Sequence, residues 1–155
     1  MSTTELVQEK PVDELLESLD VIPTICPASR IGKVYKSISR IFEEEFRGGK
    51  VTNAQFQILV HIKMLDGPGC SELSGHIGSD PSTVSRIVDT LEQRGYVTSK
   101  PGKDKRTQRY SLSRKGLTAV KEGLINWQKA YSRIVDHVGE KRWAQMQKLL
   151  TSFPQ

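Results

Sequence analysis

The segment at residues 79–95, SDPSTVSRIVDTLEQRG, constrains the fold more than any other part of the chain. Asp80 can cap a helix, and Pro81 suits the first helical position because a backbone N–H has no partner there. The apolar residues that follow recur at helical spacing and predict one buried face: Val84, Ile87, Val88 and Leu91. Gly95 ends the pattern. The sequence therefore predicts a helix that packs by one side and leaves the other side open.

The open side of this helix carries short hydrogen-bonding groups and one guanidinium near its N-terminus: Ser82, Thr83, Ser85 and Arg86. No bulky side chain there prevents close approach to another surface. Arg pairs with guanine in the DNA major groove, and Ser or Thr bonds to base edges or phosphates. We therefore expect this face to bind double-stranded DNA. The alternative is that these are ordinary first-turn residues of an exposed helix.

Two β-like runs follow, YVTSK at residues 96–100 and TQRYSL at residues 107–112, and PGKDKR joins them into a predicted hairpin. Between Arg94 and Lys115, eight Lys or Arg residues face a single acid, Asp104. The chain as a whole has a net charge of +5. A polyanionic partner explains such a local density of positive charge better than solvation does, so nucleic acid is the leading partner class.

The tip of the hairpin is predicted to contact the DNA backbone or minor groove through three cations: Lys103, Lys105 and Arg106. Asp104 lies among them, and a carboxylate facing phosphate is repelled. We therefore expect Asp104 to form a salt bridge that orients Arg106 or a nearby helix. A solvated turn is the alternative for this tip.

A short helical segment at residues 71–77 precedes the turn at Gly78. A short helix, a turn, a second helix with an open polar face and a basic hairpin together describe a winged helix-turn-helix. The expected fold class is mainly α with a small β-hairpin wing (α+β). Gly75 lies inside the short helix, where glycine costs ~1 kcal/mol. We expect this helix to be loose or to pack closely against another backbone.

Helices on both sides of this region carry apolar stripes. The first begins near Ala28 and ends at Gly48, and its stripe consists of Ile31, Val34, Tyr35, Ile38, Ile41 and Phe42. TNAQ at residues 52–55 fits a capping box that starts a second helix, apolar over most of its circumference and therefore central. Further stripes run through residues 117–153. A small winged domain cannot cover this apolar length, so we expect helix-on-helix dimerisation.

The predicted organisation is one globular domain of four parts. Residues 1–24 form an acidic N-terminal arm, 25–50 a dimerisation helix, 51–116 the winged helix-turn-helix, and 117–155 the C-terminal dimerisation helices. Pro23 and Pro27 are expected to break the chain between the arm and the body.

Three runs in order resemble the MarR family of bacterial transcription regulators: VTNAQFQIL, SELSGHIGSDPSTVSRIVDTLEQRGYV and GKDKRTQRYSLSRKG. The resemblance covers residues 51–116. The family's Asp-x-Arg motif in the wing is matched by Asp104 and Arg106, and its Leu-Thr/Ser-x-x-Gly helix start by Leu112, Ser113 and Gly116. The resemblance implies a homodimer that places two recognition helices ~34 Å apart on a pseudo-palindromic operator.

The resemblance also implies a small-molecule effector. Family members commonly act as repressors that are released by a small, often aromatic or anionic, ligand bound where the dimer helices meet the DNA-binding lobe. The positions that could line such a pocket here are Arg30, Tyr35, His61 and Trp127. Each also has a structural interpretation: Tyr35 and Trp127 lie on apolar stripes, Arg30 suits solvent, and a lone histidine on an apolar helix is usually a core residue.

Cys26 suggests a redox alternative, because some MarR-like proteins sense oxidants through a cysteine near the start of the first long helix. A helix N-terminus can favour a thiolate. A buried, inert thiol is the other interpretation of Cys26, and Cys70 is expected to be structural.

Other function classes are disfavoured. The three histidines, His61, His76 and His137, show no metal-ligand spacing and no nucleophile pairing, so we expect no enzyme, no metal and no cofactor. No segment approaches the roughly 20 apolar residues of a membrane span, so we expect a soluble cytoplasmic protein. The closer competitor is a ligand-independent winged helix that binds DNA or docks to protein.

Overall fold

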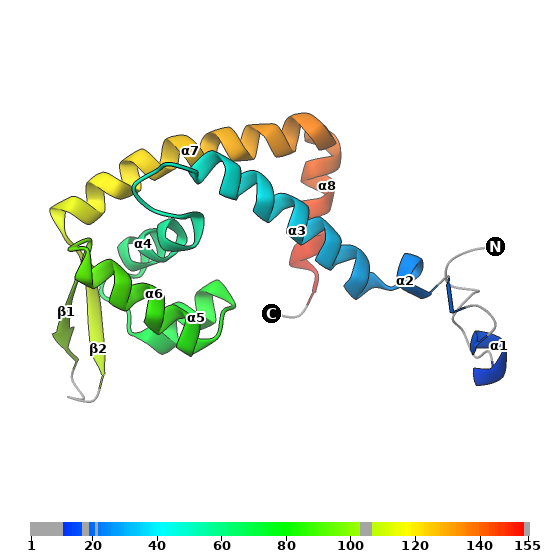
Figure 1. Ribbon diagram of the computed structural model, residues 1–155, viewed down its shortest axis with the longest axis horizontal. Helices are drawn as coiled ribbons and strands as arrows, with labels where there is room; N and C mark the ends of the chain where they lie inside the picture. Colours follow the sequence, from blue (N-terminus) through cyan, green and yellow to red (C-terminus); the bar gives the residue numbers. More distant parts are fainter. Residues whose placement is uncertain (1–10, 17–18, 21, 103–106, 154–155) are drawn as a thin grey trace. The chain divides into compact units, whose positions relative to one another are not determined.

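The computed structural model describes residues 11–16, 19–20, 22–102 and 107–153. They fall into two compact units, Met1–Arg40 and Ile41–Gln155, and each unit is described by itself. The elements in chain order are α1 (Val12–Leu16), α2 (Ile22–Ile25), α3 (Pro27–Phe46), α4 (Asn53–Leu65), α5 (Cys70–Ile77), α6 (Pro81–Gln93), β1 (Val97–Pro101), β2 (Gln108–Leu112), α7 (Arg114–Val138) and α8 (Glu140–Thr151) (Figure 1). The expected fold class, mainly α with one hairpin, is confirmed.

The first unit contains α1, α2 and most of α3. The helix expected near Ala28 begins at Pro27, but Pro23 lies inside a short helix, α2, that the sequence did not predict. Proline is compatible with the first turn of a helix because no N–H is needed there. The Cys26 N–H donates to the Ile22 carbonyl at 2.9 Å, so a helical turn bridges the segment expected to be a break.

The second unit is built around α4. The predicted capping box is present: the Thr52 hydroxyl accepts from the Gln55 N–H at 3.3 Å, and the Gln55 side chain accepts from the Thr52 N–H at 3.1 Å. Its buried side chains are Phe56, Ile58, Leu59 and Ile62. Helix α4 itself lies against α5, α6, α7 and β2 (Figure 1), as expected of a central helix.

Helix α6 packs by the predicted face. Val84, Val88 and Leu91 are fully buried. The helix ends at Gly95, whose φ of 74° is in the left-handed region that glycine adopts readily. The N–H groups of Gly95 and Tyr96 donate to the carbonyls of Glu92 and Leu91, both at 2.8 Å. This Schellman pattern turns the chain into the hairpin.

The structure contradicts one of the two alternatives expected for the short helix α5, the close packing of Gly75 against another backbone. A Cβ added to Gly75 would meet no heavy atom within 4 Å, so close packing of this glycine against another backbone is ruled out. Its neighbour Ser74 is buried instead, and the Ser74 hydroxyl donates to the Cys70 carbonyl at 2.8 Å.

Strands β1 and β2 pair antiparallel, with Val97 opposite Leu112 and Pro101 opposite Gln108. Both lie within one residue of the predicted bounds. The Tyr110 N–H donates to the Pro68 carbonyl at 3.0 Å, which attaches β2 to the loop before α5. The hairpin therefore rests on the helix-turn-helix rather than projecting freely from it.

The start of α7 explains the Leu-Ser-x-x-Gly motif in physical terms. The Ser113 hydroxyl accepts from the Gly116 N–H at 3.0 Å and donates to the Gly95 carbonyl at 2.7 Å. A Cβ on Gly116 would collide with the Tyr96 carbonyl. Serine caps the helix, and glycine lets its first turn lie against the end of α6.

Helices α7 and α8 meet at Gly139 and are joined by aromatic side chains. The Trp127 and Tyr131 rings stack with centroids 5.2 Å apart, and Trp143 of α8 donates its indole N–H to the Tyr131 hydroxyl at 3.1 Å. Several large apolar side chains on these helices and just after α8 are nevertheless exposed: Leu117, Leu124, Ile125, Leu149, Leu150 and Phe153.

Candidate nucleic-acid interface

The predicted base-reading residues all lie in the first two turns of α6. Ser82, Thr83 and Arg86 are exposed and Ser85 is partly exposed. Within the described part of the chain, the Arg86 guanidinium has no hydrogen-bond or ion-pair partner. The structure therefore presents short hydroxyls and one unused fork of donors on the face opposite the buried Val84 and Val88.

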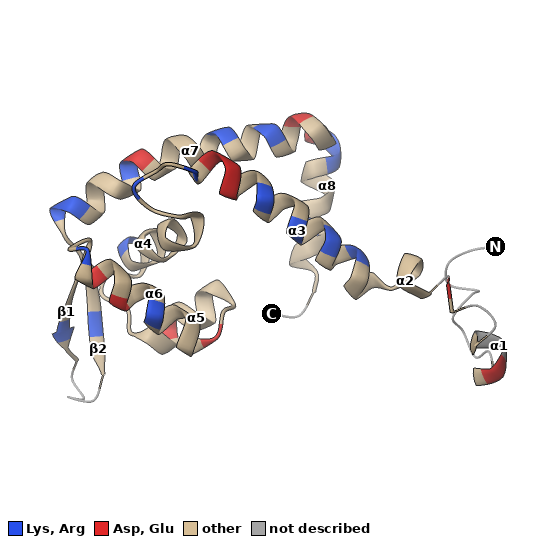
Figure 2. Ribbon diagram, viewed as in Figure 1, with Lys and Arg blue, Asp and Glu red and all other residues tan. Residues whose placement is uncertain are grey.

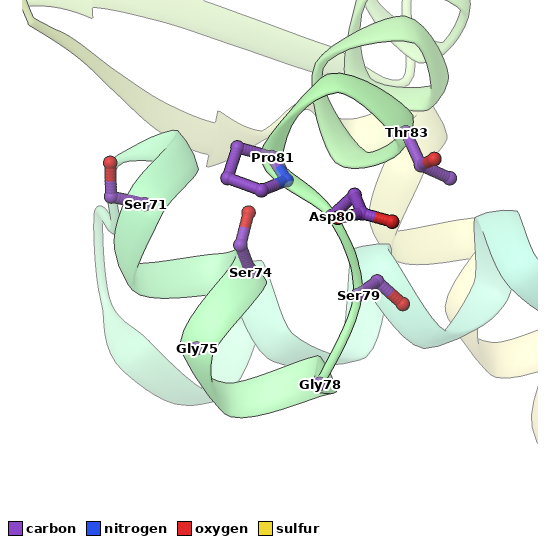
Figure 3. A pocket seen from close by; sticks show the side chains of 8 residues that line it. All are labelled: Ser71, Ser74, Gly75, Gly78, Ser79, Asp80, Pro81 and Thr83. Carbon is purple, nitrogen blue, oxygen red and sulfur yellow. The ribbon is translucent and has the colours of Figure 1, made fainter.

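The turn before α6 forms an open pocket of about 660 Å³ between α5 and α6 (Figure 3). Its lining residues are mostly small or hydroxyl-bearing: Ser71, Ser74, Gly75, Gly78, Ser79, Asp80, Pro81 and Thr83. The pocket thus lies directly beside the predicted recognition face.

Asp80 occupies the predicted N-cap position, but its predicted role is wrong in one respect. Its side chain makes no capping hydrogen bond. Only its backbone carbonyl takes part in the first turn, accepting from the N–H groups of Thr83 at 3.0 Å and Val84 at 3.1 Å. Pro81, the first residue of α6, fulfils its prediction.

The predicted wing contacts Lys103, Lys105 and Arg106, and the predicted salt bridge of Asp104, lie outside the described residues. The strands that carry this tip are described, and their basic residues are shown in Figure 2. The Arg109 guanidinium on β2 pairs with Glu72 of α5 at 2.9 Å and donates to the Gly67 carbonyl at 3.2 Å. Through these contacts Arg109 attaches β2 of the wing to the helix-turn-helix.

A second set of hydrogen bonds attaches the other strand, β1, to α6. Glu92 of α6 accepts from the Ser99 hydroxyl at 2.6 Å and from the Ser99 N–H at 3.1 Å. Neither Glu92 nor Arg109 was among the expected site residues. The sequence offers only a weak signal for such contacts. It shows an acid near the end of one helix, Glu92, and a base in the second strand, Arg109, but not which groups they meet.

Two more of the eight basic residues between Arg94 and Lys115 also act within the fold. The Arg94 guanidinium donates to the Lys50 carbonyl at 2.6 Å and lies over the Tyr96 ring, 5.0 Å from its centroid. The Lys115 ammonium lies 4.7 Å from the same centroid and donates to the Arg94 carbonyl at 2.7 Å. The count of eight basic residues is therefore higher than the number of these cations that remain available to DNA.

The four candidate ligand residues are divided between the two units. Arg30 and Tyr35 are exposed on the α3 segment of the first unit. In the second unit, the His61 ring Nδ1 lies 2.7 Å from the Gln57 carbonyl, and Trp127 stacks on Tyr131. None of the four lines the pocket at the α5–α6 turn. Their common site stays a prediction.

Cys26 lies between α2 and α3 and is partly exposed. A hydrogen bond from the Ser29 backbone N–H lowers the pKa of the Cys26 thiol. Cys70 instead directs its thiol at the Pro81 carbonyl, 3.5 Å away, across the helix-turn-helix. The two cysteines therefore have different chemical settings, as the sequence suggested.

Among the described residues, no group of three or more His, Cys, Asp or Glu side chains is arranged to hold a metal ion. No helix in that part of the chain is long and apolar enough to cross a membrane.

The short helix, the turn, the second helix and the hairpin define a winged helix-turn-helix protein. Residues 51–107 match the model of the MarR family. No curated protein matches the chain. The matched region lies within residues 51–116, where the motifs of the sequence resemble that family.

Solved structures of bacterial MarR and of two other transcriptional regulators share the fold. A mutant MarR from E. coli in complex with operator DNA superposes with a TM-score of 0.76 at 23% identity, covering 84% of this chain and 96% of that one. MosR of M. tuberculosis in complex with DNA gives 0.71 at 23% identity, with 81% and 91% covered. PcaV of Streptomyces coelicolor with its natural ligand gives 0.75 at 15% identity, with 83% and 92% covered.

Proposed function

We propose that the protein is a transcriptional regulator of the MarR family, which binds a pseudo-palindromic operator as a homodimer and represses transcription in the bacterial cytoplasm. The observation that carries the proposal is the α6 face, where Ser82, Thr83 and Arg86 are exposed beside a hairpin fastened to the same helix. Ser85 lies on this face as well. Similar proteins solved with DNA, the E. coli MarR mutant and MosR, support it.

The dimer part of the proposal rests on exposed apolar surface. Leu149, Leu150 and Phe153 on and after α8, and Leu124 and Ile125 on α7, are all exposed in the single chain. We propose that these side chains belong to one surface, because a large exposed apolar patch marks a protein contact. A two-fold contact through these helices would present two copies of α6 to successive turns of DNA, ~34 Å apart.

The effector part of the proposal is that a small aromatic or anionic molecule releases the protein from DNA. The similar PcaV was solved with its natural ligand, which supports this possibility for the shared fold. Arg30, Tyr35, His61 and Trp127 remain the proposed lining. A ligand that binds the folded protein raises its melting temperature, and a ligand-independent module would show no such shift with any compound.

The division of labour between helix and wing gives the test of DNA binding. Replacing Arg86 with Ala should weaken operator binding by about 1–3 kcal/mol and relax the preference at one position per half-site. Replacing Arg106 with Ala should weaken binding to operator and random DNA alike and reduce the salt slope by about 1. Fluorescence anisotropy on both duplexes measures the two effects.

The matched control for these variants is Lys129→Ala on α7, which removes one exposed positive charge far along the chain from the winged region. It should leave both affinities nearly unchanged. Equal losses on operator and random DNA for both Arg86→Ala and Arg106→Ala would contradict the assigned roles.

A second candidate function, oxidant sensing, is favoured by the lowered pKa of the Cys26 thiol beside the Ser29 N–H. The lowered pKa increases the thiolate fraction near neutral pH, and the thiolate is the reactive form. We expect iodoacetamide to modify Cys26 faster than Cys70. The difference between the two rates should decrease as the pH rises above the usual pKa range of thiols, where both cysteines are thiolates. Mass spectrometry of timed samples measures both rates, and equal rates at neutral pH would remove this candidate.

A further inference from the structure

The side chain of Asp80 is not used by the fold. An N-cap aspartate normally accepts from a backbone N–H in the first turn of its helix. The Asp80 side chain makes no such bond, and the described residues offer it no ion pair. It is also exposed. A carboxylate at the start of α6 is therefore available to another molecule.

The position of this carboxylate places it on the proposed DNA face. Among the described residues that line the pocket of about 660 Å³, Asp80 is the one acidic side chain. In Figure 3 the side chains of Ser79, Asp80 and Thr83 point to the same side of the turn. Thr83 belongs to the predicted base-reading set, and Ser82 and Arg86 follow on the same helix. A molecule that approaches Thr83 from that side therefore also approaches Asp80.

A carboxylate on a DNA-binding face is unfavourable unless it finds a donor. Phosphates repel it, and so do the acceptor groups of guanine and the thymine carbonyl. The donors in the major groove are the amino groups of cytosine and adenine. The adenine amino group lies next to the N7 acceptor, which repels a carboxylate, whereas the cytosine N4 amino group is the usual partner of Asp and Glu.

We propose that Asp80 is a specificity-determining residue that accepts a hydrogen bond from a cytosine amino group in each half-site. The inference rests on the proposed function, because it requires that α6 enter the major groove. Asp80 then contributes to specificity by weakening binding to the wrong bases. A base that offers only acceptors leaves the carboxylate without a hydrogen-bond donor among the phosphates. The expected discrimination is about 5- to 150-fold at that position, the range typical of one specific base contact.

The test compares binding profiles selected from a random duplex library by the full-length wild-type protein and by variants. Asp80→Asn keeps a good N-cap residue but prefers adenine, whose N6 and N7 it can contact together. Its profile should change from cytosine to adenine at one position per half-site. Asp80→Ala should lose the preference there. Asp89→Asn, which removes an exposed charge in the middle of the same helix, should leave the profile unchanged.

Two outcomes overturn the inference in different ways. A wild-type profile with clear sequence preference that Asp80→Asn leaves unchanged overturns the role of Asp80 alone and leaves the proposed function standing. A wild-type profile without sequence preference overturns the proposed function, and the inference with it. Melting temperatures of the variants, expected within a few degrees of the wild type, exclude misfolding as the cause of an altered profile.

Discussion

Replacing Gly116 with Ala is expected to lower the free energy of unfolding by about 2 kcal/mol, after a helix-propensity gain of about 1 kcal/mol is subtracted. The new Cβ would collide with the Tyr96 carbonyl, which is main chain and already accepts from the Ser113 N–H at 3.0 Å. The start of α7 must therefore move away from the end of α6. Thermal denaturation should show a melting temperature lower by about 4–8 °C.

Gly75→Ala is the matched control for this variant. Gly75 is also helical, but a Cβ there meets nothing within 4 Å, so alanine should raise the free energy of unfolding by about 0.5–1 kcal/mol. If the two alanine variants had the same stability, the close contact between α7 and the junction of α6 and β1 would not exist.

Replacing Phe56 with Ala is expected to lower the free energy of unfolding by about 3–5 kcal/mol, because a large core ring leaves a cavity. Phe56 is 3% exposed, and its ring centroid lies 5.2 Å from that of Phe46. The ring also fills the space in front of Gly123, where a Cβ would collide with it. Denaturation of this variant should begin about 6–20 °C lower.

Met64→Ala on the same helix is the control for Phe56→Ala, since Met64 is 61% exposed in the single chain. Its stability should change by less than about 0.5 kcal/mol unless the exposed surface of α4 is covered in the assembly. A loss below about 1 kcal/mol for Phe56→Ala would contradict the central position of α4.

Local signals in the sequence were sufficient wherever the structure depends on neighbours in the chain. The capping box at Thr52, the left-handed turn at Gly95 and the serine cap at Ser113 each join groups within a few residues. The buried face of α6 follows from a regular period. Such features depend on backbone hydrogen bonds and helical spacing, which a sequence displays directly.

Features that depend on distant partners could not be read in the same way. Arg109 meets Glu72, 37 residues earlier in the chain, and Arg94 meets the Lys50 carbonyl, 44 residues earlier. The sequence analysis counted both arginines among the cations available to DNA. In the structure their side chains are bonded within the protein instead. The prediction that the Asp80 side chain caps α6 was wrong for a related reason. The residue type predicts that Asp80 stands at the N-cap position, but it does not determine the direction of its side chain.

The measurement that tests the central claim most directly is fluorescence anisotropy of the wild-type protein on DNA from upstream of its own gene. Random DNA of the same length serves as the control, and both titrations are repeated over a range of salt concentrations. The account predicts tight, sequence-dependent binding whose logarithm falls linearly with log salt, with a slope of several ions. Weak binding that is equal on both duplexes would contradict it.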